Sequence, residues 1–206
     1  MRRVLALGIV NSGKSSLLSA LADEEKLFPS GDVPRVTREI QQETRGGFLL
    51  VDTPGLDAPN EDVELAFQSA RSAHTVLWCH SLRMGELRPT ELSALRRYKT
   101  TNGLWRTCFV LTHGDNVASF EIVRVVSKRI AEQLGEVFGL RFVGVGERIP
   151  PPPPGKRNPR PFNVVGTIDY WRAKTASGPD LERHLNRSGI PRLRKFLLSL
   201  RPEGKS

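Results

Sequence analysis

Cysteine is scarce in this chain of 206 residues, which has two, Cys79 and Cys108, in separate apolar segments. Their spacing matches no metal-binding motif, so we expect buried thiols in a reducing compartment, the cytoplasm. The four histidines form no cluster along the sequence, which argues against a zinc site. No apolar run approaches the roughly 18 residues of a membrane-spanning helix. The short apolar run after Arg3 leads straight into a glycine-containing loop, so we expect no signal peptide.

Acidic residues are scarce in the last quarter of the chain. Residues 151–206 hold 12 Lys or Arg against 4 Asp or Glu, so most of the net charge of +9 belongs to this region. This asymmetry predicts an acidic partner for residues 151–206, namely RNA, an anionic membrane surface or an acidic protein. A basic tail that is simply solvated is the alternative interpretation.

Glycine marks the most informative stretch, Gly8–Ser16, which reads GIVNSGKSS. It follows an apolar stretch of strand length (residues 4–7) and precedes residues 17–21, whose apolar spacing suits a helix. A Gly-x-x-x-x-Gly-Lys-Ser loop in this context predicts a phosphate loop, because its glycines let successive backbone N–H groups point inward. Lys14 would then reach the β- and γ-phosphates, and the hydroxyl of Ser15 would hold Mg²⁺.

Apolar runs of strand length alternate with helical patterns along the rest of the chain. The predicted strands cover residues 39–43, 47–52, 75–79, 107–111 and 141–145, and the predicted helices cover about 61–72, 89–98 and 119–138. Such alternation favours right-handed crossovers and a mostly parallel sheet covered on both sides. We therefore expect an α/β fold of three layers, α/β/α, around a six-stranded sheet, with ligands at the carboxyl ends of the strands.

Three further residues follow predicted strands or lie in polar loops near that edge. Asp52 closes an apolar strand, where a carboxylate can reach the shell of a bound Mg²⁺ through water. Gly55 can bring its backbone N–H against a γ-phosphate, because no side chain stands in the way. Thr37 lies in the loop before the second predicted strand, where it would complete the Mg²⁺ shell and sense the γ-phosphate. Ser30 is the rival hydroxyl for that role.

The stretch Leu111-Thr112-His113-Gly114-Asp115 ends another predicted strand. A carboxylate at Asp115 would accept hydrogen bonds from N1–H and the exocyclic amino group of guanine, donors that adenine lacks at those positions. The ring of His113 would lie flat on the base. This stretch therefore predicts a preference for guanine over adenine nucleotides.

These motifs carry a family resemblance. The loop GIVNSGKSSLLSAL, a single Thr at position 37, DTPG at 52–55 and THGD at 112–115 resemble, in this order and spacing, the P-loop GTPases of the translation-factor class, in their Era/TrmE/septin-like branch. The resemblance covers about residues 3–145 and returns at 188–200, which is similar to that family's last helix. It implies a chain that binds GTP and GDP with Mg²⁺, and relatives often dimerise through the nucleotide face.

The resemblance also implies a role for particular residues. It implies phosphate binding by Asn11, Ser12, Gly13, Lys14, Ser15 and Ser16. It implies Mg²⁺ binding by Ser15, Thr37 and Asp52, and catalytic roles for Lys14, Thr37 and Gly55. For the guanine base it implies Thr112, His113 and Asp115, together with the backbone of Gly144 and Val145, where residues 165–167 are the alternative.

The sequence departs from the family's pattern in ways that affect chemistry. His113 stands where the family usually has a lysine, although a similar Thr-His pair occurs in the septin-related GTPases of plastid import. Leu56 stands where signalling GTPases place a water-orienting glutamine, so slow hydrolysis is expected unless another group supplies the charge. Asn11 matches an asparagine that binds K⁺ in some relatives, so K⁺ is a candidate second cation.

Prolines break the pattern after residue 149. We predict a GTP-binding domain over residues 1–149 and 188–201, a Pro-rich basic insertion over 150–187, and a disordered tail over 202–206. Within the insertion, residues 163–168 read as β-like and would either add a strand to the sheet edge or fold over the nucleotide.

The sequence thus predicts a GTPase that converts GTP to GDP and phosphate and acts as a nucleotide-dependent switch. The alternative is a slowly hydrolysing or non-hydrolysing GTP-loaded scaffold that docks an acidic partner through its basic C-terminal quarter.

Overall fold

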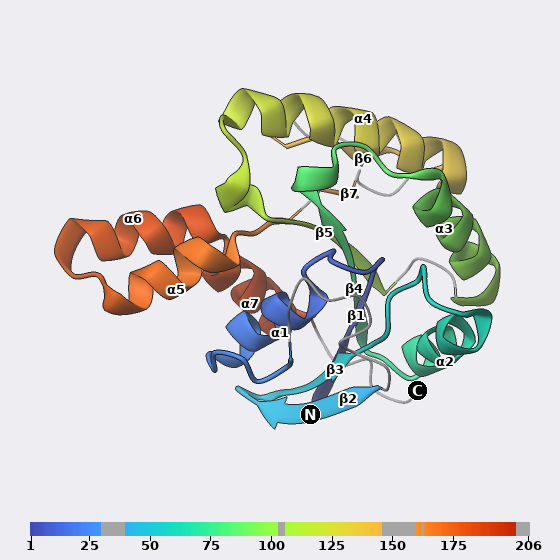
Figure 1. The fold of residues 1–206 in the computed structure, drawn as a ribbon, viewed down its shortest axis with the longest axis horizontal. Coiled ribbons are helices and arrows are strands. Elements are labelled where there is room, and N and C mark those ends of the chain that lie inside the picture. The colour runs from blue at the N-terminus through green and yellow to red at the C-terminus, as the bar shows by residue number, and fades with distance from the viewer. Residues whose placement is uncertain (30–39, 103–105, 146–159, 162, 201–206) are drawn as a thin grey trace.

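Six strands of the computed structural model run side by side in one sheet with helices on both faces (Figure 1). The structure describes residues 1–29, 40–102, 106–145, 160–161 and 163–200. The strands of the sheet are β1 (Arg2–Leu7), β2 (Gln41–Arg45), β3 (Phe48–Asp52), β4 (Thr75–Ser81), β5 (Thr107–Thr112) and β8 (Asn163–Val164). The helices are α1 (Lys14–Ala22), α2 (Asn60–Arg71), α3 (Pro89–Asn102), α4 (Phe120–Phe138), α5 (Thr167–Thr175), α6 (Gly178–Ser188) and α7 (Ile190–Ser199), with 3₁₀ turns η1 (Leu82–Met84) and η2 (Gly114–Asn116).

The sheet has the order β2-β3-β1-β4-β5-β8. All neighbouring pairs are parallel except β2 with β3, whose hairpin turns at Gly46-Gly47. Because β1, β3, β4, β5 and β8 point the same way, their carboxyl ends meet at one edge. The predicted α/β architecture with a mostly parallel six-stranded sheet is therefore confirmed.

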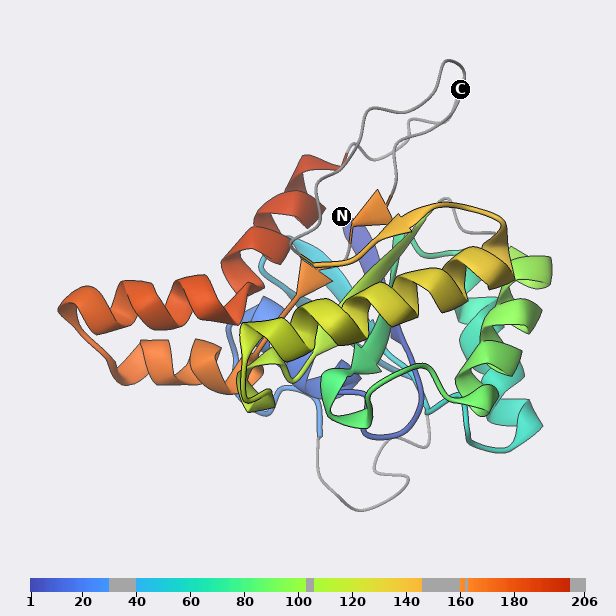
Figure 2. The same cartoon turned by 90° about the horizontal axis from the view of Figure 1, so that it is seen from above.

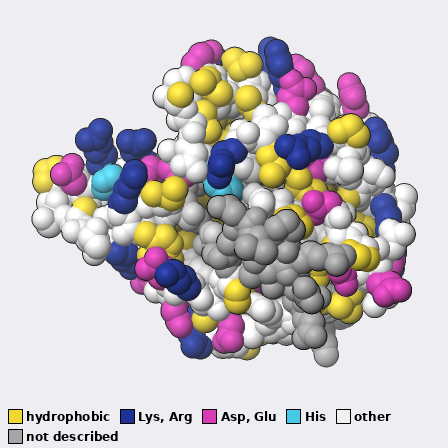
Figure 3. Space-filling view, viewed as in Figure 1, with side chains coloured by type: hydrophobic (Ala, Val, Ile, Leu, Met, Phe, Trp, Pro, Cys, Tyr) yellow, Lys and Arg dark blue, Asp and Glu magenta, His cyan; other side chains and the backbone are white. Residues whose placement is uncertain are grey.

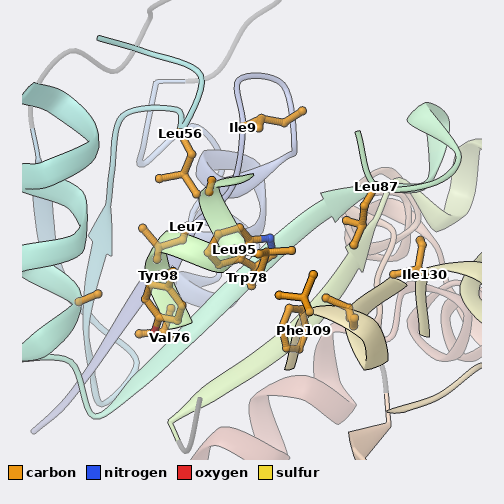
Figure 4. Packing of buried hydrophobic residues seen from close by; sticks show 14 of the residues in the cluster. Leu7, Ile9, Leu56, Val76, Trp78, Leu87, Leu95, Tyr98, Phe109 and Ile130 are labelled. Carbon is orange, nitrogen blue, oxygen red and sulfur yellow. The ribbon is translucent and has the colours of Figure 1, made fainter. Parts of the chain in front are cut away.

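Alternation of side chains along the strands builds two separate apolar cores. Leu5 and Leu7 of β1 face one core, which α2, α3 and α4 cover, whereas Val4 and Ala6 face the other, which α1, α5 and α7 cover. In the first core the indole of Trp78 on β4 packs against Tyr98 of α3, with their ring centroids 5.4 Å apart (Figure 4). These two cores hold the sheet between its two layers of helices.

The sixth strand differs from the one predicted. Residues 141–145 were expected to form it, but β6 (Phe142–Val143) pairs instead with β7 (Arg160–Pro161) in a small separate sheet. The place beside β5 is taken by β8, whose Val164 stands opposite Leu111. The β-like stretch within the predicted insertion therefore supplies the sheet edge, and the main sheet extends into the region 150–187.

Helices α5 and α6 form a hairpin that projects from the body of the molecule (Figure 2). We call residues 167–188 the arm. After it, α7 returns to the sheet and buries Ile190, Leu193 and Leu197, as the predicted final helix should. Of the helices in the described ranges, none combines the length and apolar character needed to span a bilayer.

Candidate nucleotide-binding site

The phosphate loop joins the end of β1 to the start of α1. Gly8 has a φ of +152°, and a Cβ there would lie 2.4 Å from the carbonyl oxygen of Cys79. Gly13 precedes the first turn of α1 in the left-handed conformation, with φ +82°. Since side chains rarely adopt either conformation, glycine is required at both ends of the loop. The loop leads from the carboxyl end of β1 straight into α1, so the first-turn N–H groups of α1 point toward that end of the sheet.

Lys14 is buried beneath the loop. Its Nζ donates a hydrogen bond of 2.9 Å to the carbonyl oxygen of Ile9. Burial lowers the pKa of the Lys14 ammonium, and the nearby Asp52 carboxylate opposes that shift. An anion bound in the loop would stabilise the charged form of this lysine, which suits a phosphate-binding role.

Ser15 and Asp52 meet at the ends of α1 and β3. The Ser15 hydroxyl donates to Asp52 Oδ2 at 2.6 Å, and Asp52 is completely buried. A hydroxyl and a carboxylate are hard oxygen donors of the kind Mg²⁺ prefers when phosphates and water fill its remaining positions. These two residues therefore fit a magnesium site. Thr37, the third predicted ligand, lies outside the described residues.

The segment after β3 lies directly against the phosphate loop. The Leu56 N–H donates to the carbonyl oxygen of Gly8 at 3.1 Å. A Cβ on Gly55 would lie 2.7 Å from the backbone nitrogen of Val10, so glycine permits this approach. The Leu56 side chain is buried among core residues beside Leu7 (Figure 4).

Asp57, in this segment, was not among the predicted site residues. Asp57 Oδ1 accepts a hydrogen bond of 2.7 Å from the N–H of Val10, a phosphate-loop amide. Asp57 also lies close enough to Lys14 to raise the pKa of that lysine. Its position two residues after Gly55 was the available signal, but no spacing rule distinguishes it from the other acids in this part of the chain.

The end of β5 joins the phosphate loop through a side chain. Thr112 Oγ1 donates to the carbonyl oxygen of Ser12 at 2.7 Å. A Cβ on Gly13 would lie 3.1 Å from Cε1 of His113, so the predicted base motif adjoins the loop. The His113 ring is held by Ser81, whose Oγ lies 2.9 Å from Nδ1. The structure thus brings together the phosphate and base motifs, which are about a hundred residues apart in the sequence.

Asp115 stands in η2 with residues 165–167 beside it. Its Oδ2 accepts hydrogen bonds from the backbone N–H groups of Ile168 (2.8 Å) and Asp169 (3.2 Å). Its Oδ1 is buried and has no hydrogen-bond partner among the described residues. A buried carboxylate oxygen without a donor is costly, so this oxygen fits an acceptor for a ligand N–H.

Comparison with known families decides the class of this site. The sequence model of one family, described as 50S ribosome-binding GTPase, matches residues 3–111, more than half of the chain. The chain belongs to this GTPase family. The match covers the phosphate loop, Asp52 and Gly55, so the resemblance read from the motifs is confirmed.

Curated relatives of this GTPase share part of its length. The tRNA modification GTPase MnmE of Phocaeicola vulgatus is 33% identical over 100 residues, which are 44% of this chain and 20% of that protein. The GTPase Der of Leptospira interrogans is 34% identical over 87 residues, 36% of this chain and 18% of that protein. The GTPase described here therefore spans about a fifth of the length of each relative.

Solved structures share the fold of this GTPase at low sequence identity. Toc33 from Arabidopsis thaliana in complex with GDP and Mg²⁺ aligns with a TM-score of 0.65 and 18% identity over 95% of this chain and 82% of that one. Era from Aquifex aeolicus bound to GDP and AlF₄⁻ aligns with a TM-score of 0.65 and 18% identity over 100% and 59%. These likenesses support the P-loop GTPase fold.

The geometry of this GTPase favours the alternative for one predicted part of the base site. Gly144 and Val145 were expected to contact the base, but the Val145 N–H already donates to Ser127 of α4 at 2.8 Å. Residues 165–167, the alternative, lie against the base motif instead: the Gly114 N–H donates to the carbonyl oxygen of Val165, and a Cβ on Gly166 would lie 2.6 Å from Asp115 Oδ2. The reason is the changed sixth strand, because the loop beside Asp115 must follow the strand beside β5.

Proposed function

We propose that this chain binds GTP and GDP with Mg²⁺, hydrolyses GTP to GDP and phosphate, and switches conformation with the nucleotide. The observation that carries the proposal is the hydrogen bond from Thr112 to the carbonyl oxygen of Ser12, which fixes the base motif beside the phosphate loop. A phosphate loop with a carboxylate beside it that can accept hydrogen bonds from guanine suits a guanine nucleotide better than a free phosphate.

Each part of the site has a task in this proposal. The amides of residues 11–16 and the Lys14 ammonium bind the phosphates and stabilise the charge that develops during transfer. Ser15 and Asp52 would hold Mg²⁺, which would neutralise charge on the phosphate oxygens. The Gly55 N–H contacts the γ-phosphate, and the segment from Gly55 onward follows its presence or absence. Thr37 remains the proposed third group at the metal.

Purified protein with GTP or ATP and Mg²⁺ provides the test. We expect micromolar GTP binding, no measurable ATP binding and phosphate release from GTP in single turnover. Lys14→Ala should lose nucleotide binding. Equal binding of ATP and GTP would contradict the guanine assignment. Comparison of turnover in Na⁺ and K⁺ buffers tests the further proposal that Asn11 helps bind K⁺, since equal rates would exclude it.

A second candidate function, a slowly hydrolysing or non-hydrolysing scaffold, is favoured by Leu56. Its side chain is buried and apolar, so it cannot orient a water molecule as a glutamine would. The proposed docking surface lies on the C-terminal helices, where Lys and Arg side chains gather (left of Figure 3). The described cations of these helices are Arg172, Lys174, Arg183, Arg187, Arg192, Arg194 and Lys195.

Two assays separate these functions. Phosphate release faster than nucleotide dissociation would favour the switch, and bound GTP that persists unhydrolysed would favour the scaffold. Binding to RNA, to anionic vesicles and to an acidic protein at several salt concentrations would identify the acidic partner.

Because one solved Toc33 structure is described as a dimerisation-deficient mutant, we also propose self-association through the nucleotide face. The molar mass in solution with GDP and with a GTP analogue tests it.

A further inference from the structure

The projecting arm has no role in nucleotide binding in the function proposed above, although it begins beside the base motif. Its two helices pack along each other. The last residue of α6 lies beside the start of α5, since the Gly166 N–H donates to the carbonyl oxygen of Ser188 at 2.9 Å. Between them, the buried Asp169 carboxylate lies 3.1 Å from Nδ1 of His184 and 3.4 Å from Nε of Arg187. These contacts make the arm a single unit anchored beside η2.

The first turn of α5 is capped by a residue from outside the helix. The first amides of a helix lack partners within it, and a polar side chain at the N-cap usually supplies one. Here the N-cap is Gly166, which has no side chain. Asp115 supplies the missing acceptor, because its Oδ2 accepts hydrogen bonds from the backbone N–H groups of the second and third residues of the helix, Ile168 and Asp169.

The two oxygens of Asp115 therefore have different environments. Oδ2 already accepts two hydrogen bonds, which fills its ordinary capacity, since an ionised carboxylate has about four acceptor sites in total. Oδ1 is buried without a partner among the described residues, so both of its acceptor sites remain for a ligand.

We propose that the arm is a positioning element of the guanine site: the first-turn amides of α5 hold Asp115 Oδ2 so that Oδ1 accepts from the base, and a bound base in turn stabilises the arm. This inference rests on the proposed binding of guanine nucleotides. Coupling between two sites is reciprocal, so whatever the arm contributes to guanine affinity, guanine contributes to the order of the arm. The arm thereby carries the state of the base site to a surface outside the nucleotide pocket.

Amide hydrogen exchange tests the effect of the base on the arm. The amides to follow are those of α6 within residues 181–186, because they lie beyond the first turn of α5 that the nucleotide itself would contact. We expect Mg²⁺–GDP to slow their exchange about fivefold or more, the lower end of ordinary coupling energies, and Mg²⁺–pyrophosphate to leave it unchanged. Unchanged exchange in α6 with GDP bound would overturn the inference. Failure of GDP to bind at all would instead overturn the proposed function.

The effect of the arm on the base is tested with Asp169→Ala, which removes the carboxylate that holds α6 to α5 but keeps the amide bonded to Asp115. The ratio of GDP to IDP affinity is the measurement, because inosine lacks the exocyclic amino group that Asp115 would read. We expect this ratio to fall at least threefold in Asp169→Ala. A loss of stability alone would weaken GDP and IDP binding equally and leave the ratio unchanged.

Asp180→Ala is the matched control, since Asp180 is an exposed carboxylate in the first turn of α6. It should keep the wild-type ratio. If Asp169→Ala does not fold, Arg187→Gln provides a milder break of the same contact and should lower the ratio in the same direction. A wild-type ratio in a folded variant of either kind would overturn the inference.

Discussion

Gly8→Ala is the sharpest test of the phosphate loop as the structure describes it. The added Cβ would lie 2.4 Å from the Cys79 carbonyl oxygen and 2.5 Å from Ser12 Oγ. Carbon–oxygen contacts of this length essentially never occur, so the loop must move away from β4. The backbone conformation adds strain, because φ at Gly8 is +152°.

The expected cost combines these two effects. Backbone strain of this kind costs about 1–3 kcal/mol, and overpacking about the same again, so the free energy of unfolding should fall by about 2–6 kcal/mol. Urea denaturation of the nucleotide-free protein measures this loss. Where the variant still folds, Mg²⁺–GDP should no longer stabilise it, since the displaced amides no longer converge on a phosphate.

Gly139→Ala is the control for backbone strain alone. Gly139 ends α4 with φ +64°, and a Cβ there meets nothing within 4 Å. We expect a loss of about 1–2 kcal/mol and unchanged GDP affinity. Gly8→Ala with wild-type GDP affinity, or with a stability no lower than that of Gly139→Ala, would refute the reasoning.

Three further predictions concern the metal, the core and the arm. Ser15→Ala should lower the Mg²⁺ dependence of nucleotide binding by removing the hydroxyl that lies 2.6 Å from Asp52. Titrations with GDP in Mg²⁺ and in EDTA measure it, and an unchanged ratio would exclude Ser15 as a ligand. Glu91→Ala should lower the free energy of unfolding by about 3–5 kcal/mol, because it leaves His80 without its partner in a pair that is 2% and 0% exposed. Urea denaturation should show this with GDP affinity unchanged, and a loss under about 1 kcal/mol would contradict it. Burial, with the hydrogen bond to Asp23, raises the pKa of Tyr170 from 10.0 to about 12. The wild type should therefore be more stable than Tyr170→Phe below pH 10 and lose that advantage as the pH rises from 10 to 12, because the unfolded chain ionises first. Denaturation of both proteins across that range measures the difference, and an advantage independent of pH would contradict the assigned cause.

Local sequence patterns predicted the parts of the fold that local physics determines. The apolar runs gave β1, β3, β4 and β5 to within a few residues, and the glycines at 8 and 13 placed the phosphate loop. The periodicity of residues 190–200 likewise placed α7. In each case the residues that form the element carry the signal themselves.

The sixth strand shows where such patterns fail. Residues 141–145 and 163–168 both read as short strands, and neither pattern states which one pairs with β5. The choice depends on the backbone pairing of β5 with β8, in which Leu111 stands opposite Val164, a residue far away in the sequence. The choice between the two candidate base loops was open for the same reason, because the position of each loop follows from the strand before it.

Two parts of the site left no local signal that sets them apart from ordinary surface residues. The hydrogen bond from Val10 to Asp57 requires the segment after Gly55 to fold over the loop, and exposed acids are common in such segments. The cap that Asp115 provides to α5 joins residues about fifty positions apart. Contacts of this kind depend on the completed fold, so only the structure could reveal them.

The central claim is that the phosphate loop and Asp115 together select a guanine nucleotide. Affinities for GDP and XDP, measured on the wild type and on Asp115→Asn with Mg²⁺ present, test it most directly. Xanthine has a carbonyl oxygen where guanine has its amino group, so an amide at position 115 can donate where the carboxylate could only accept. We expect the wild type to prefer GDP and Asp115→Asn to prefer XDP. An Asp115→Asn protein that is folded and keeps the wild-type preference for GDP would contradict it.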